Sequence, residues 1–199
     1  METNVTGTAA GEEAAPKKRT LIQQERKGLQ IRDILLIGIL LASGAVLKFF
    51  VGSIINFGMK PNFIIAMYCL IILLIKPRII EAAIIGLLAG AICQFFPGQP
   101  YLNLISELFG AVAMCLLSKI PLEKLKIPVK TIFCTFFSTL VSGFSFIGVM
   151  YLLYYARSNV LVTPPTPLAI FMAIIFGTAA INAVIVQILY IPLKLALKK

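Results

Sequence analysis

One apolar segment contains three polar residues and a glycine at a helical spacing, which could place them on one binding face. Asn103, Ser106, Glu107 and Gly110 are separated by three or four positions, so a helix would carry all of them on one side. A charged group inside an apolar segment costs free energy and requires a partner. For Glu107 that partner is either a cationic group of a ligand or Lys48 in a structural salt bridge, and the sequence leaves both open.

A second group of residues could bind an anion and a ring. Lys60 stands before an apolar segment that begins at Pro61, and free N–H groups at a helix start favour anions such as a carboxylate. An exposed loop lysine is the alternative. Phe57, Phe96 and Tyr101 lie near the same ends of their segments, where an interfacial aromatic belt would also place them. With Glu107 for an amine, these residues predict a site for an aromatic zwitterion.

The composition places this site in a membrane. Of 199 residues, 59% are hydrophobic and 13% charged, against about 45–50% and about 25% in soluble domains. Because the chain has no His, it can form neither a Ser-His-Asp triad nor an HExxH zinc site. It also has no P-loop motif, so a partner would have to hydrolyse any ATP that drives it. We therefore expect no enzyme and no cofactor.

Six apolar segments follow a polar stretch. They cover about residues 33–50, 61–75, 79–96, 101–117, 131–155 and 167–195. Backbone polar groups in lipid must be paired within the segment, so each is predicted to be a helix. The sequence thus predicts an all-α integral membrane protein, with a disordered cytoplasmic tail over residues 1–30 and a six-transmembrane-helix bundle over residues 31–199.

The basic residues predict the orientation of that bundle. Of the 18 Lys and Arg, only Lys48, Lys60 and Arg157 fall on one side of the six segments. The other fifteen flank the segments on the opposite side, which the positive-inside rule makes cytoplasmic. Both termini are therefore expected inside. The same placement explains the net charge of +10 without a nucleic-acid partner. The four cysteines lie in four different segments and are expected to be small buried side chains rather than metal ligands.

Small residues at a spacing of four predict close helix contacts. In the first segment they are Gly38 and Ala42. Others lie in the third, fifth and sixth segments: Ala82, Gly86 and Gly90; Ser138 and Ser142; Ala169, Ala173 and Gly177. Such residues let helix backbones approach closely in lipid, either within the bundle or against another membrane subunit. The first segment is the candidate for docking a partner.

Two stretches of the chain resemble motifs of a known family. The stretch 56–63, Asn-Phe-Gly-Met-Lys-Pro-Asn-Phe, resembles the FGMKP loop of the bacterial tryptophan transporter family TrpP. So does the Gly86-x-x-x-Gly90 segment that runs into Phe-Phe-Pro-Gly at 95–98. That family is similar to the substrate-binding S components of energy-coupling factor (ECF) transporters, which are six-helix proteins of the bacterial cell membrane. The resemblance implies a partner T component and two ATPase subunits, docked through Gly38 and Ala42.

The residues and the resemblance together predict a membrane subunit that captures tryptophan or a related aromatic solute. In this hypothesis Lys60 binds the carboxylate and Glu107 the amine. Four further residues contact or orient the ring: Asn103, Phe57, Phe96 and Tyr101. A self-sufficient, ion-coupled transporter of amino acids or vitamins is the alternative, and an intramembrane enzyme or assembly factor is a third.

Overall fold

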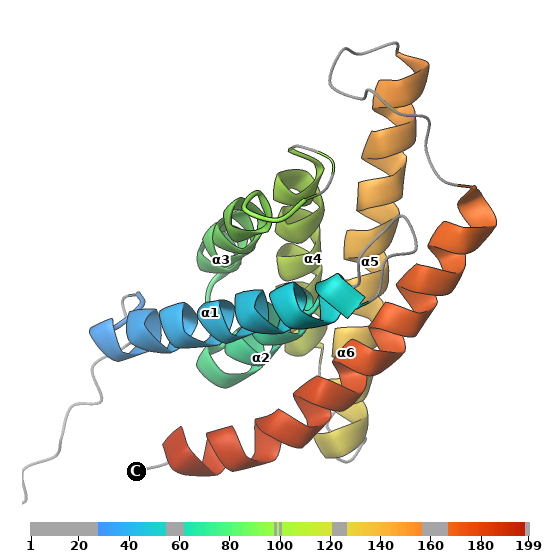
Figure 1. Ribbon diagram of the computed structural model, residues 1–199. Helices are drawn as coiled ribbons and strands as arrows, with labels where there is room; N and C mark the ends of the chain where they lie inside the picture. Colours follow the sequence, from blue (N-terminus) through green and yellow to red (C-terminus); the bar gives the residue numbers. More distant parts are fainter. Residues whose placement is uncertain are drawn as a thin grey trace, which may run out of the picture.

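Six helices account for all the predicted segments. A computed structural model of the chain describes residues 28–54, 62–97, 99, 101–120, 127–156 and 167–197, with side chains at all of these except 51–54 and 127–128. The helices are α1 (Ile31–Ile54), α2 (Ile64–Ile75), α3 (Ile79–Cys93), α4 (Leu102–Lys119), α5 (Ile127–Tyr155) and α6 (Leu168–Leu197) (Figure 1). The described residues contain no strand, so the all-α class is confirmed.

Four of these helices have the length and apolar composition to cross a membrane. They are α1, α4, α5 and α6. Helix α2 has 12 residues and α3 has 15, which gives about 18 and 22 Å of helix against about 30 Å of hydrocarbon. Six complete spans were expected, and four of the described helices have spanning length. The expected tail over residues 1–30 falls almost wholly outside the described residues.

Helix α2 is the centre of the bundle. It contacts each of the other five helices, and Figure 1 shows α1 lying across it. Its residues are buried on every side, with the half-buried Leu74 as the exception. A helix that is apolar all round is typical of such a position, and every α2 residue except Tyr68 is aliphatic or sulfur-containing. The strongest apolar run of the chain therefore forms protein core and does not face lipid.

Glycines bring α3 against α4. An added Cβ at Gly86 would lie 2.6 Å from the carbonyl oxygen of Glu107, and one at Gly90 would lie 2.7 Å from that of Asn103. The predicted small-residue ladder of this helix thus packs inside the bundle. On the other side of α4, the Ser138 hydroxyl of α5 donates to the Gly110 carbonyl at 2.9 Å. Both contacts fix α4, which carries Glu107.

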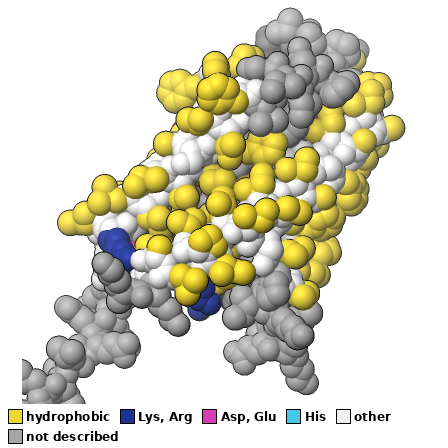
Figure 2. Space-filling view, turned by 60° about the horizontal axis from the view of Figure 1, so that its bottom comes forward, with side chains coloured by type: hydrophobic (Ala, Val, Ile, Leu, Met, Phe, Trp, Pro, Cys, Tyr) yellow, Lys and Arg dark blue, Asp and Glu magenta, His cyan; other side chains and the backbone are white. Residues whose placement is uncertain are grey.

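The start of α1 and the end of α6 lie together. The Arg32 guanidinium donates to the Leu197 carbonyl at 3.1 Å, and the end of α6 lies on the same side of the bundle as the start of α1 in Figure 1. In Figure 2, hydrophobic side chains predominate on the described part of the face, with Lys and Arg at its lower edge. This surface fits a multi-pass membrane protein whose basic residues gather beyond the apolar part.

Candidate functional site

Glu107 is buried between three elements of the bundle. It lies in the second turn of α4 and is 1% exposed. One carboxylate oxygen accepts a hydrogen bond from the side-chain amide of Asn62, which stands just before α2. The other accepts from the Ser142 hydroxyl of α5 at 3.1 Å. Ser106 and Gly110 are buried on the same face of α4, as the helical spacing predicts.

Lys48 is buried beside this group. Its side chain is only 7% exposed. Its ammonium lies 3.0 Å from the sulfur of Cys93 and 5.4 Å from the centre of the Phe96 ring. The side-chain nitrogen of Asn62 lies 3.6 Å from the same sulfur. Among the described residues, Lys48 and Glu107 are therefore joined through Cys93 and Asn62 and not by a direct ion pair.

Asn62 ties the site to α6 as well. Its backbone carbonyl accepts from the Asn182 amide at 3.2 Å, and its own side-chain oxygen accepts from the Ile64 N–H at 3.3 Å, at the first turn of α2. We call the six residues joined in this way the buried polar cluster. Its members are Lys48, Asn62, Cys93, Glu107, Ser142 and Asn182. Five helices contribute to it directly, and α2 contributes through Asn62, which lies two residues before its first residue.

The charges of the cluster suit a cationic ligand group. Glu107 receives its two hydrogen bonds from neutral donors, while the one cation of the cluster, Lys48, donates to sulfur. A buried carboxylate without a directly paired cation is costly. A carboxylate offers about four lone-pair positions, so about two remain for further donors. The arrangement can therefore accept hydrogen bonds from an ammonium group.

The structure brings two of the predicted site residues together. Glu107 belongs to the cluster, and half-buried Phe96 lies against Lys48. Half-buried Asn103 lies one turn before Glu107 and accepts the Ser106 hydroxyl at its carbonyl, at 3.4 Å. Tyr101 is 64% exposed and starts α4 with a positive φ of 64°, so its ring is not in the cluster.

Two other predicted residues, Lys60 and Phe57, lie outside the described residues. Their proposed roles therefore remain predictions. The described chain resumes at Asn62, two positions after Lys60.

Four members of the buried polar cluster were not predicted as binding residues from the sequence. Ser142 was noted only as a small residue, and Cys93 only as a buried one. Asn182 gave a usable signal, because it is an amide within the very apolar sixth segment, where polar side chains are costly. Asn62 sits within the quoted motif, but its partners come from positions 45 and 120 residues away. No local pattern indicates such contacts.

The two residues predicted to dock a partner subunit are exposed on the surface of the bundle. Gly38 and Ala42 are exposed on α1, and an added Cβ at Gly38 would meet no atom within 4 Å. Helix α1 contacts α2 and α3 and leaves large apolar side chains such as Leu35 and Ile39 exposed on its other side. A partner helix would find room on this face.

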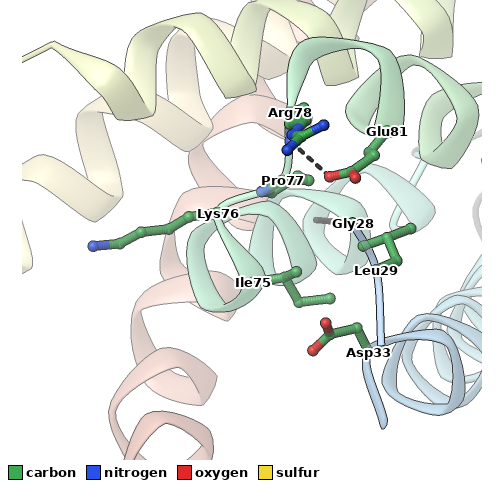
Figure 3. A pocket seen from close by; sticks show the side chains of 8 residues that line it. All are labelled: Gly28, Leu29, Asp33, Ile75, Lys76, Pro77, Arg78 and Glu81. Carbon is green, nitrogen blue, oxygen red and sulfur yellow. Dashed lines mark hydrogen bonds between the residues drawn. The ribbon is translucent and has the colours of Figure 1, made fainter. Parts of the chain in front are cut away.

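A pocket lies at the other end of the bundle from the buried polar cluster, between the start of α1 and the turn from α2 to α3 (Figure 3). It is lined by Gly28, Leu29, Asp33, Ile75, Lys76, Pro77, Arg78 and Glu81. Both of its carboxylates cap the first turn of a helix. Glu81 accepts a hydrogen bond from the Arg78 N–H at 2.8 Å, at the start of α3. Asp33 accepts one from the Gln30 N–H at 3.1 Å, at the start of α1. This pocket has no role in the site that we propose.

Comparisons with known proteins agree with the resemblance. The family described as "Tryptophan transporter TrpP" matches residues 30–198. A similar protein is the "Probable tryptophan transport protein" of Clostridium acetobutylicum, which is 27% identical over 173 residues, or 85% of this chain and 96% of that protein. No solved structure matches the chain.

Proposed function

This chain belongs to the tryptophan transporter TrpP family, and from that membership we propose that it captures tryptophan, or a related aromatic solute, in the buried polar cluster. The observation that carries the proposal is Glu107, a buried acid whose described hydrogen-bond donors are neutral. An α-ammonium group would supply the missing cation. Membership of a transporter family also favours transport over catalysis.

The remaining contacts are assigned by chemistry. We assign the solute carboxylate to Lys60, at the approach to α2, where free N–H groups favour an anion. The ring would contact Phe96, which already lies against the Lys48 ammonium, together with Phe57. Asn103 and Tyr101 would orient the solute from the start of α4. These four contacts and Lys60 form the part of the proposal that rests on the sequence.

A fluorescence titration tests tryptophan binding directly. Because the chain has no Trp, excitation at the red edge of indole absorption reports the ligand almost alone. We expect a saturable blue shift of tryptophan emission when it is titrated with the purified protein in detergent, and reversal of that shift by non-fluorescent analogues. A folded protein that produces no shift would contradict the assignment of tryptophan.

We further propose that uptake is driven by ATP through an ECF T component and two ATPase subunits. Two features support this: the chain has no P-loop, and α1 presents an open face with Gly38 and Ala42. The alternative is a self-sufficient, ion-coupled transporter, which buried Glu107 would also suit. Uptake that survives an uncoupler but is lost without the ATPases supports the first. Uptake that is lost with the uncoupler alone supports the second.

Replacing Gly38 by Leu should separate docking from binding. A leucine on an open small-residue face prevents the close approach of a partner helix, so we expect at least tenfold slower uptake and unchanged tryptophan binding. The measurements are cellular uptake and co-purification of partner subunits. Gly177→Leu is the matched control, since Gly177 is equally open but lies on α6. Equal losses of uptake in both variants would contradict a docking role that is specific to α1.

The proposal also includes the location and orientation. A multi-pass protein of this family would lie in the bacterial cytoplasmic membrane with both termini inside. The contact of Arg32 with Leu197 supports a common side for the two ends, and the positive-inside rule identifies that side as cytoplasmic.

A further inference from the structure

We propose that Asn182 and Tyr68 complete, with Glu107, a three-acceptor site that selects solutes with a free primary ammonium. This inference rests on the proposed function, since it concerns the recognition of the same solute. Neither residue has a counterpart in the sequence-based prediction. Both are 0% exposed. The Asn182 amide oxygen has no hydrogen-bond partner in the described part of the chain, and the Tyr68 hydroxyl lies beside Glu107 and Ser142, where its oxygen can still accept a hydrogen bond.

The orientation of the Asn182 amide is fixed by its neighbour. Its nitrogen donates to the backbone carbonyl of Asn62 at 3.2 Å. A carbonyl accepts and never donates, so the Asn182 nitrogen must face Asn62, and the amide oxygen must take the other position. The Asn182 amide group therefore lies beside Asn62, whose side chain donates a hydrogen bond to Glu107. A buried amide oxygen without a donor is unfavourable, and a ligand N–H would satisfy it.

The Tyr68 hydroxyl lies on the same side of α4 as Glu107. An added Cβ at Gly110, three residues after Glu107, would overlap this hydroxyl and would come within 2.8 Å of Cβ of Ser142. Ser142 in turn donates to Glu107. The hydroxyl oxygen therefore lies next to the Ser142–Glu107 pair, in a part of the bundle where Gly110 leaves it room.

Three acceptors suit the chemistry of an α-ammonium. A primary ammonium carries three N–H donors and no acceptor, as the lysine side chain does. Glu107 would supply the charge, and Asn182 and Tyr68 would supply two neutral oxygens. A site of this kind rejects analogues that lack the donors, because its buried acceptors then remain unpaired. We therefore expect selection for amino acids over indole carboxylic acids without an amine.

The test compares tryptophan with indole-3-propionate, which has the ring and the carboxylate but no amine. Asn182→Leu should weaken tryptophan binding by about tenfold to 100-fold, the effect of losing a hydrogen bond to a charged group. Binding of indole-3-propionate should change by less than about threefold on the same grounds. Tyr68→Phe, which removes one oxygen and keeps the ring, should act in the same direction. Both ligands are followed by their own fluorescence.

Gln187→Leu is the matched control. Gln187 also lies on α6 and has a buried amide oxygen without a partner in the described residues, but it makes no contact with the cluster among the hydrogen bonds described above. This variant should bind both ligands like the unmodified protein. Thermal melting of all variants shows whether each is folded.

The outcomes separate this inference from the proposed function. If the unmodified protein binds neither ligand, both are overturned. If it binds tryptophan but the two variants weaken both ligands equally, or neither, the ammonium site alone is overturned. A repeat in choline chloride tests a metal cation: tryptophan binding that requires sodium, and loses that requirement in Asn182→Leu, would assign the acceptors to sodium and overturn the ammonium site.

Discussion

Replacing Glu107 by Gln should weaken tryptophan binding by about 30-fold or more, while indole binding changes by less than about threefold. The amide keeps the shape of the carboxylate. Its oxygen can still accept from Asn62, and its NH2 group can donate to the Ser142 hydroxyl, which can also act as an acceptor, so the fold should persist. The substitution removes the buried negative charge that would pair with the ammonium group of tryptophan. Truncating one partner of a buried charge pair costs about 2–5 kcal/mol, which corresponds to about 30-fold to several thousand-fold in affinity. Fluorescence titration of the two ligands measures both effects.

Glu81→Gln is the control for this prediction. Glu81 is also an acid in the first two turns of a helix, but its carboxylate caps α3 by accepting the Arg78 N–H. We expect this variant to bind tryptophan with unchanged affinity. Equal losses of tryptophan and indole affinity in Glu107→Gln would contradict the assignment of the amine to Glu107.

Replacing Gly86 by Ala should destabilise the bundle and weaken binding together. The new Cβ would lie 2.6 Å from the Glu107 carbonyl and 2.8 Å from Cβ of Ala111, distances that force α3 away from α4. Overpacking of this kind costs about 1–3 kcal/mol, partly offset by about 1 kcal/mol of helix propensity. We expect the midpoint of thermal unfolding in detergent to fall by several degrees, at about 2–4 °C per kcal/mol. Tryptophan affinity should fall as well, because the shifted backbone carries Glu107.

Gly38→Ala provides the comparison. The same change in an open position meets no atom within 4 Å, so the helix propensity gain should act alone and the midpoint should stay equal or rise slightly. If both variants melt at the same temperature, the close contact between α3 and α4 does not limit stability.

The helices could be predicted from the sequence because the signal for each is local. All six described helices begin and end within about four residues of the predicted limits. One difference matters for the site: α2 begins at Ile64 and not at Pro61. Asn62 is thereby left outside the helix, with its side chain free to reach Cys93 and Glu107.

The site could be predicted only in part, because its contacts join distant segments. Glu107 was identified through the periodicity of its own helix. The surroundings of Lys48 could not be predicted, because its ammonium contacts Cys93, 45 residues later, and no pattern in α1 indicates that contact. Asn182 belongs to the cluster because α6 packs on α2, a tertiary arrangement that an apolar run does not specify. Tyr101 was expected at the site because of its position in the sequence. In the structure it has a positive φ and an exposed ring, which lies outside the buried polar cluster.

The central position of α2 has a consequence for how the protein is made. At 12 residues, α2 is too short to insert across a bilayer as an independent segment. Yet it leaves the ribosome second of the six, while α6, which covers its side near Asn182, leaves last. During synthesis the most apolar segment of the chain therefore lacks part of its packing partners until α6 has been synthesised and inserted. The buried polar cluster cannot assemble before that moment, so the proposed binding site is completed only once α6 is in place.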